Sequence, residues 1–491
     1  MPIPFNNSYA RLPDAFFAAA SPTPVTAPAM IGLNRELATT LGIDVAELDS
    51  PEGLAFLAGN KIPAGAEPLA MAYSGHQFGG FSPQLGDGRA ILLGEVVGSD
   101  GIRRDIQLKG SGQTPFSRRG DGRSALGPVL REYIVSEAMA ALGVPTTRAL
   151  AAVTTGDDVV REGLVPGGIF TRVARSHIRI GTFEWFASRK DPDNLRVLAD
   201  HVIGRHYPDA TTEDNPYRFL LDGVIERQAK LVAHWMQIGF IHGVMNTDNM
   251  SVSGETLDYG PCAFLDNYDA GKVFSSIDHQ GRYAFGNQGP IAFWNLTRLA
   301  ETLLPLLDDE QDAAVAIAET ALKRFPDRYD SFLRKRLTAK IGIGDGVPIN
   351  NDEDDWKLIE TLLAVMTQGE ADFTLVFRHL SDALETGNDD AVVALFNTPD
   401  GIVSWLGDWR ARLDDAHRGA ALTVMRRANP VFIPRNHRVE EAIVAGNQGD
   451  FEPFHRLNRV LEQPFAVQPE FEAYESPPGP DEVVEETFCG T

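Results

Sequence analysis

The sequence predicts an α+β protein with a β-rich N-terminal lobe and a larger helical C-terminal lobe. Residues 67–110 are rich in glycine and strand-like runs, whereas apolar residues recur at helical spacing from residue 290 to about residue 461. With 491 residues, 43% of them hydrophobic, the chain can bury a large core. We expect residues 1–165 to form the first lobe with an N-terminal extension and residues 166–465 the second. Residues 466–491, which lack Lys and Arg, are expected to form an acidic flexible tail.

Composition excludes several classes of protein. The chain carries 44 Lys and Arg against 68 Asp and Glu, a formal charge of −24, which argues against binding nucleic acid or anionic lipid. Its two cysteines, Cys262 and Cys489, lack CxxC spacing, so neither a disulfide framework nor a zinc site is indicated, although one bridge between them stays open. No signal-peptide pattern and no apolar run of about 20 residues occurs, so we expect a soluble, cytoplasmic protein without a membrane partner.

The first predicted element is a β-hairpin. Two apolar runs, residues 90–97 and 102–109, flank a glycine-bounded polar turn. In the second run Ile106 and Leu108 alternate with Gln107 and Lys109, which puts Lys109 on the face opposite the apolar pair. A solvated strand lysine is an equally good interpretation of this residue alone.

A helix is predicted next, over residues 127–142. Pro128 suits its first turn and Gly143 suits its exit. Either Glu132 or Glu137 could meet Lys109 if the helix packs beside the hairpin, and spacing alone does not separate them. The ordinary alternative is a solvent-facing acid for Glu132 and an acid at the edge of the buried stripe for Glu137.

Two copies of the tetrapeptide Gly-Asp-Gly-Arg precede the hairpin and the helix, at residues 86–89 and 120–123. Glycines let backbone N–H groups approach an anion, and an adjacent arginine can clamp a phosphate. A phosphate cradle and two ordinary tight turns are equally good interpretations. Neither a Walker lysine motif nor a Rossmann glycine motif occurs.

Arg172 and Arg179 are seven residues apart and would share a face if their segment were helical. Such a pair suits a polyphosphate, but a surface ion pair is favoured on sequence alone. His177, between them, could be a general base, although an isolated histidine more often packs or hydrogen-bonds.

The segment from residue 241 to residue 260 carries the richest polar pattern. Ser253-Gly254 predicts a turn between two short strands, and this hairpin would return Asp258 beside Asn249. An amide oxygen and a carboxylate are hard ligands suited to Mg²⁺ or Mn²⁺, and Asp248 is placed to accept a hydroxyl proton. A lysine, an acid on the following helix, and this loop occur in the order used by kinases, which indicates phosphate-transfer chemistry. An Asx-rich loop making its own turn bonds is the weaker alternative.

The chain also resembles the selenoprotein O family of protein-kinase-like pseudokinases over nearly its whole length. The motifs that carry the resemblance are YSGHQFG at 73–79, LKGSGQTP at 108–115, SEAM at 136–139, HGVMNTDN at 242–249, DYGP at 258–261 and NP at 429–430. In this chain Asp248 and Asn249 are adjacent, whereas ordinary kinases separate the base from the metal-binding asparagine, so the geometry of the base does not transfer from kinases.

The resemblance implies a two-lobed kinase-like fold that transfers AMP from ATP to Ser, Thr or Tyr hydroxyls of target proteins, with the γ-phosphate held innermost. By matching positions, the nucleotide would be bound by Gly86, Gly88, Arg89, Lys109, Asp121, Gly122, Arg172, Arg179 and Asp258. The metal ligands would be Asn249 and Asp258, the base Asp248, and the partner of Lys109 would be Glu132 rather than Glu137. Some relatives end in selenocysteine, so a redox role would rest on Cys262 or Cys489 here.

Two rival functions stay open at this stage: a protein kinase that moves the γ-phosphoryl group, and a catalytically silent ATP-binding scaffold. The sequence also leaves open the target proteins, the choice between Mg²⁺ and Mn²⁺, UTP in place of ATP, self-modification and the oligomeric state.

Overall fold

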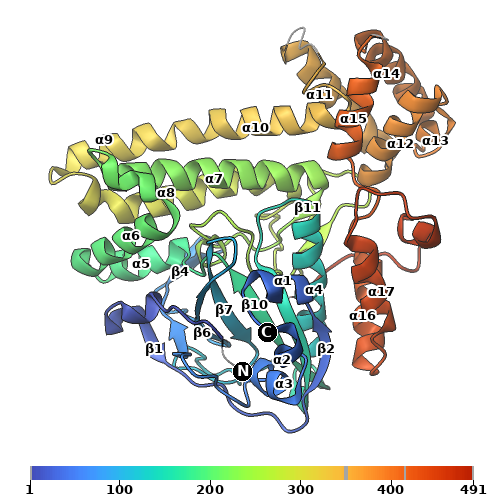
Figure 1. The fold of residues 1–491 in the computed structure, drawn as a ribbon. Helices are drawn as coiled ribbons and strands as arrows, with labels where there is room; N and C mark the ends of the chain where they lie inside the picture. Colours follow the sequence, from blue (N-terminus) through green and yellow to red (C-terminus); the bar gives the residue numbers. More distant parts are fainter. Residues whose placement is uncertain (1–2, 348–351, 414–415, 489–491) are drawn as a thin grey trace.

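The computed structural model describes residues 3–347, 352–413 and 416–488, and its N-terminal part is built around an eight-stranded antiparallel sheet (Figure 1). The strands run in the order β1 (Phe17–Ala19), β3 (Leu69–Met71), β6 (Ala90–Val97), β7 (Arg103–Lys109), β10 (Leu164–Ala174), β9 (Arg148–Val160) and β2 (Ala29–Leu33), and β8 (Ser124–Ala125) pairs with β10. Two small antiparallel pairs stand apart, β4 (Gly75–Gln77) with β5 (Gly80–Ser82) and β11 (Phe240–Ile241) with β12 (Ala263–Phe264). The predicted mixture of strands and helices is confirmed.

The hairpin expected from the alternating pattern is formed by β6 and β7, which pair Ala90 with Lys109. Ile106 and Leu108 are fully buried in a core cluster shared with α1 (Arg35–Thr40), α2 (Val45–Leu48) and α3 (Pro51–Leu57). Because side chains alternate along a strand, Gln107 and Lys109 face the other side of the sheet. That other side carries the candidate site.

The predicted helix is α4 (Leu126–Ala141), within one residue of its expected bounds, and Gly143 leaves it with a left-handed φ of 80°. It packs against β9 and β10 on one side and against α16 (Asn436–Asn447) and α17 (Glu452–Leu461) on the other (Figure 1). With both sides covered, Glu132 is only 3% exposed. The alternative of a solvent-facing acid at this position is therefore wrong.

The remaining helices lie outside this sheet, and α7 and α10 run side by side above it (Figure 1). They are α5 (Ile180–Ser188), α6 (Pro192–His206), α7 (Pro216–Ile238), α8 (Gln288–Leu307), α9 (Gln311–Leu322), α10 (Arg324–Lys340), α11 (Asp352–Gly369), α12 (Phe373–Thr386), α13 (Asp390–Val393), α14 (Pro399–Arg412) and α15 (Arg418–Ala428). The apolar stripe predicted on α8, with Leu296, Leu299, Leu303 and Leu307, is buried as expected.

The acidic stretch that begins near residue 466 contains a short 3₁₀ helix, Pro469–Tyr474, and then runs back to the body of the protein. The Thr487 hydroxyl donates to the carbonyl of Pro261 at 2.7 Å, and its N–H donates to the carbonyl of Phe274 at 2.7 Å. Cys262 is buried beside this contact. Cys489, the other candidate for a redox role, lies outside the described residues.

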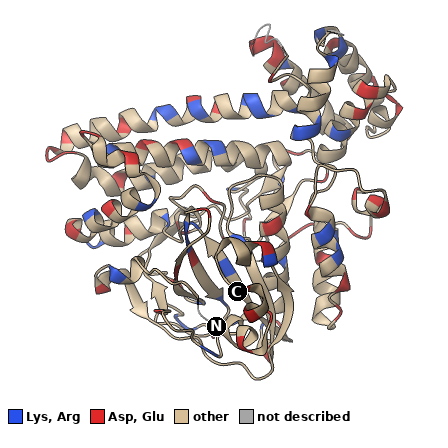
Figure 2. Cartoon of the chain, in the orientation of Figure 1, with Lys and Arg blue, Asp and Glu red and all other residues tan. Residues whose placement is uncertain are grey.

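Charged residues of both signs are interspersed along the long helices α7 and α10 (Figure 2). Within the described ranges, every helix is either too short or too polar to cross a lipid bilayer.

Candidate functional site

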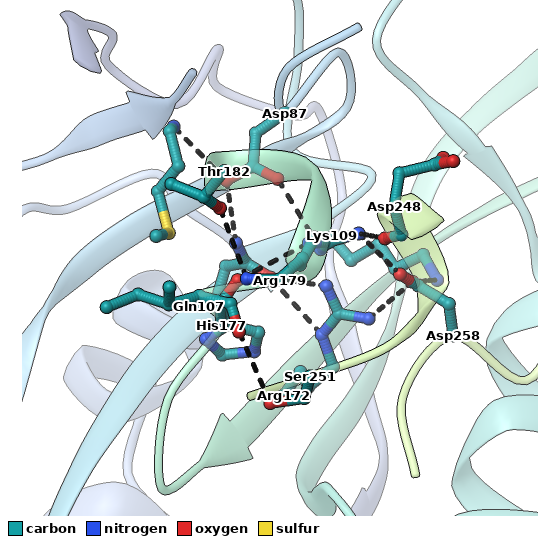
Figure 3. Close-up of polar contacts among 12 residues, drawn as sticks. Asp87, Gln107, Lys109, Arg172, His177, Arg179, Thr182, Asp248, Ser251 and Asp258 are labelled. Atoms are coloured by element: carbon teal, nitrogen blue, oxygen red, sulfur yellow. Dashed lines mark hydrogen bonds and ion pairs between the residues drawn. The ribbon is translucent and has the colours of Figure 1, made fainter. Parts of the chain in front are cut away.

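Three cationic side chains converge on the carboxylate of Asp258 (Figure 3). Lys109 Nζ lies 2.9 Å from Oδ1, Arg172 Nη1 lies 2.5 Å from the same oxygen, and Arg179 Nη1 lies 2.8 Å from Oδ2. Burial alone would raise the pKa of Asp258, but Arg172, Lys109 and Arg179 hold it well below its ordinary value. Asp258 is therefore ionised, and its charge is shared among three cations.

Glu132 is the acid that pairs with Lys109, with 2.5 Å between Oε2 and Nζ. Its other oxygen lies 3.2 Å from Arg172 Nη1. Glu137, one turn further along α4, binds Arg148 instead and accepts the backbone N–H of Ala149 at 2.8 Å. The two acids thus serve different parts of the fold, because they leave α4 in different directions.

Arg172 and Arg179 do not share one helix. Arg172 lies on β10, and Arg179 is the residue before α5 begins, so a strand and a helix start bring the two guanidinium groups together. Both are buried, at 1% and 2% exposure, and the surface ion pair favoured from the sequence is wrong. A guanidinium buried this deeply needs several partners, since an unpaired charge in the interior costs several kcal/mol, on the order of 3–5.

Two polar residues that the sequence analysis did not single out hold the arginines in place. Gln107 accepts from Arg172 Nη2 at 2.6 Å and donates to Asp87 Oδ2 at 3.0 Å. Asp87 Oδ1 lies 3.7 Å from Arg179 Nη2. The alternation along β7 already placed Gln107 on the same face as Lys109, and Asp87 is the acid of the first Gly-Asp-Gly-Arg copy, so both signals were available.

The catalytic-loop candidate forms a single 3₁₀ turn, Thr247–Asn249, rather than the start of a hairpin. The predicted pairing of strands around Ser253-Gly254 is wrong, because Ser251 pairs with Arg179 and Thr256 pairs with Thr146. The loop still approaches Asp258, since Arg179 Nη1 donates both to the Asp248 carbonyl at 2.7 Å and to Asp258. The backbone on either side of Ser253-Gly254 therefore pairs with distant parts of the chain and not with itself.

The Asp248 carboxylate is turned away from the three cations (Figure 3). It is 7% exposed, and burial raises its pKa to about 6, against the opposing effects of Arg179 and of a hydrogen bond from Gln77. At neutral pH most of this carboxylate is ionised, and its proton affinity is higher than that of an ordinary aspartate. Both properties suit a group that accepts a proton.

Asn249 and Asp258 have the chemistry of a site for Mg²⁺ or Mn²⁺. The Asn249 Nδ2 donates to the Val244 carbonyl at 3.0 Å, which leaves the amide oxygen as the ligand atom. No group of three or more His, Cys, Asp or Glu side chains able to hold a metal occurs in the part of the chain that the structure describes. A metal here would take these two oxygens together with phosphate oxygens, as Mg²⁺ commonly does.

The first Gly-Asp-Gly-Arg copy lies beside the cluster. A Cβ atom at Gly86, whose φ is 73°, would lie 2.3 Å from the Phe116 ring, so this position requires glycine. A Cβ atom at Gly88 would lie 3.0 Å from the Phe116 carbonyl oxygen, which leaves little room for a side chain. Arg89 lines the same cavity as Lys109, and its Nη1 is buried without a hydrogen-bond partner among the described residues. Such a donor is suited to an anion.

The second copy contacts other groups. Asp121 pairs with Arg161 at 2.9 Å, near the surface, and Gly122 has a left-handed φ of 67° with its backbone packed on Gly112. The loop that carries them also packs on the first copy, since the Thr114 hydroxyl donates to the Asp87 carbonyl at 2.6 Å. Asp121 and Gly122 are thus near the first copy but not in contact with the Lys109 cluster.

His177 lies outside the cluster. Its Nδ1 is 3.0 Å from Asp105 Oδ2, and its backbone N–H donates to the same oxygen at 2.9 Å. Burial lowers the pKa of His177 to about 4, so the ring is neutral. These contacts support the packing role rather than a general base.

The space next to the cluster is small. A cavity of about 10 Å³ is lined by residues that include Arg89, Lys109, Glu132, Tyr259 and Phe488. Lys109, Arg172 and Arg179 are bound to carboxylates in this structure, so a nucleotide would need them to exchange these partners for phosphate oxygens.

Comparison with known proteins gives a consistent result. A family model described as protein adenylyltransferase SelO matches residues 1–462. Proteins named protein nucleotidyltransferase YdiU from two strains of Rhodopseudomonas palustris, BisB5 and HaA2, are 61% and 60% identical to this chain. One of the same name from Bradyrhizobium sp. strain BTAi1 is 60% identical. Each match covers 99% of both chains.

Proposed function

Because the chain belongs to the family of protein adenylyltransferase SelO, we propose that it transfers AMP from ATP to hydroxyl side chains of other proteins and releases pyrophosphate. It is a nucleotidyltransferase whose substrates are ATP and a protein. We further propose the kinase-like arrangement of two lobes, with the nucleotide between them. Because β10 (Leu164–Ala174) belongs to the N-terminal sheet, we place the boundary after Ala174 rather than between the expected ranges 1–165 and 166–465. The cytoplasmic location and the tail's flexibility stay predictions.

The observation that carries the proposal is the convergence of Lys109, Arg172 and Arg179 on one carboxylate, all three at 9% exposure or less. An ordinary kinase site uses one lysine on its phosphates. Three buried cations suit a triphosphate that enters with its terminal phosphate first. Several negative charges are then buried at once, and each needs a compensating cation nearby. That orientation leaves the α-phosphorus toward the outside, where a protein hydroxyl can reach it.

In the proposed reaction, the oxygen of the acceptor hydroxyl bonds to the α-phosphorus while Asp248 receives the proton of that hydroxyl. The bond between the α-phosphorus and the oxygen that bridges to the β-phosphate breaks, and pyrophosphate leaves with both electrons of that bond. Lys109, Arg172 and Arg179 hold the departing phosphates and stabilise their charge. A divalent cation on Asn249 and Asp258 would supply further charge neutralisation on the phosphates. Arg89, with its buried donor, and the loop with Asp121 and Gly122 would complete the nucleotide site.

The test uses ATP labelled at either the α or the γ position, incubated with the full chain, Mg²⁺ or Mn²⁺, and dephosphorylated casein as a general acceptor rich in hydroxyl groups. We expect protein-bound label from the α position only, and a mass increase of one AMP group. Label from the γ position alone would instead establish a kinase, and label from neither would leave an ATP-binding scaffold.

Asp248→Asn is the matched variant for the chemical step. It keeps the shape of the side chain but removes the proton acceptor, so we expect transfer to fall by about 100-fold or more. Binding of a fluorescent ATP analogue should stay within about twofold, because the phosphates are held by other residues.

A further inference from the structure

The YSGHQFG motif lies directly on the catalytic loop. Its residues form β4 and the turn into β5, and this hairpin is anchored to the loop from several sides. The His76 N–H donates to the Thr247 hydroxyl at 2.7 Å, and the Phe78 N–H donates to Asn246 Oδ1 at 3.2 Å. Asn246 and Thr247, the two residues before Asp248, are thus tied to a segment about 170 positions earlier in the chain.

Glu184, on α5, contacts both partners of the hydrogen bond between His76 and Thr247. One carboxylate oxygen lies 2.5 Å from His76 Nδ1, and the other accepts the Thr247 hydroxyl proton at 2.5 Å. The side chain is 4% exposed, so this bridge is protected from water. Hairpin, loop and α5 therefore form one rigid unit around Asp248.

The two oxygens of Asp248 have different surroundings within this unit. Oδ1 is buried without a hydrogen-bond partner among the described residues, and a Cβ atom added to Gly75 would lie 2.7 Å from it. Oδ2 accepts a hydrogen bond from Gln77 Nε2 at 3.1 Å. Since Oδ1 is buried next to Gly75, Oδ2 is the oxygen that an incoming hydroxyl can meet.

We propose that Gln77 is a positioning residue for AMP transfer, which holds Asp248 with Oδ2 toward the acceptor hydroxyl while Oδ1 lies buried next to Gly75. This inference rests on the proposed function. Gln77 is only partly buried and makes its contact from the hairpin, so it can act on the base without touching the three cations that hold the phosphates. A carboxylate oxygen has more than one lone pair, so Oδ2 can keep the hydrogen bond from the Gln77 amide and still take the proton.

Gln77→Leu tests the proposal, because leucine is of similar size and cannot donate. We expect kcat for AMP incorporation into dephosphorylated casein to fall about tenfold, as the carboxylate loses its fixed direction. The KM for ATP, the binding of the fluorescent ATP analogue and the melting temperature should stay unchanged. Gln468→Leu is the matched control. It removes a hydrogen bond of 2.9 Å from Gln468 Nε2 to the Val460 carbonyl, far from the loop.

Gly75→Ala is a second test, which acts on Asp248 Oδ1 rather than on Oδ2. Its added Cβ would displace Oδ1, so kcat should again fall while nucleotide binding persists. Gln77→Leu with unchanged kcat, or with a loss explained wholly by weaker ATP binding, would overturn the proposal even though the wild-type enzyme transfers AMP. Absence of α-label transfer by the wild type would instead refute the proposed function, and the inference with it.

Discussion

Single residues decide how the charged cluster is built, and the choice between Glu132 and Glu137 is the clearest case. Both acids lie on α4, and spacing alone could not separate them because the spacing rule assumes one buried side, whereas this helix is covered on both. The family resemblance selected Glu132, and Glu132 is the acid that pairs with Lys109. The types and order of the polar residues could be read from the sequence. Their partners could not, because Gln107 and Asp87 act only through contacts that the tertiary fold creates.

Glu132→Gln removes the charge that faces Lys109 and Arg172, so the lysine loses its fixed position. We expect AMP transfer to fall by about 10- to 100-fold. Glu137→Gln should leave the rate of transfer within about twofold but lower the free energy of unfolding by about 1–3 kcal/mol, since it weakens the bond to Arg148. Rates measured at a temperature where both variants are folded by circular dichroism would distinguish the two; equal rates would contradict the assignment.

At the scale of elements, long periodic segments were predictable and short paired ones were not. The β6–β7 hairpin, α4 and α8 follow directly from their apolar patterns, because each buries its stripe against close neighbours. The hairpin expected around Ser253-Gly254 failed because Ser251 and Thr256 find partners from other parts of the chain. Two arginines seven residues apart would share a face only in a helix, yet a strand ends between Arg172 and Arg179 and the fold brings their side chains together by another route.

The end of α10 carries a buried lysine that yields a prediction at this scale. Lys340 is 1% exposed, with Nζ 4.3 Å from the centre of the Phe377 ring and 5.0 Å from that of Phe373. No carboxylate forms an ion pair with it within the described ranges. Burial lowers the pKa of Lys340 to about 7 from 10.5.

Below pH 7 both the folded and the unfolded chain hold this proton, and the folded state bears the full cost of a buried charge. Between about pH 7 and 10.5 the unfolded state binds more protons, so stability should rise with pH. Lys340→Met should raise the free energy of unfolding at pH 7 by roughly 2–4 kcal/mol and flatten this rise. Lys335→Met, an exposed lysine on the same helix, is the control for urea unfolding at several pH values; equal effects would contradict the prediction.

At the scale of the whole molecule, the C-terminal helices α16 and α17 complete the core of the N-terminal part. The Phe454 ring is 1% exposed and lies 5.2 Å from that of Tyr133 on α4. The sequence predicted helices here but not their destination, since an apolar stripe does not say which surface it will cover.

Phe454→Ala should lower the free energy of unfolding by about 3–5 kcal/mol, because it opens a cavity between α17 and α4. Urea unfolding followed by circular dichroism measures this loss. Val444→Ala on the neighbouring α16, where the side chain is 56% exposed, should change stability by less than about 0.5 kcal/mol. A small effect at Phe454 would mean that the two parts are stable without this contact.

The double covering of α4 also bears on how the protein is made. The helix that carries Glu132 is synthesised early, but its outer side is covered by residues up to Leu461, so a nascent chain exposes that apolar side until nearly all of the polypeptide has left the ribosome. The apolar side of α4 is therefore covered only late in synthesis, and a chain that ends before α16 and α17 would leave this side exposed.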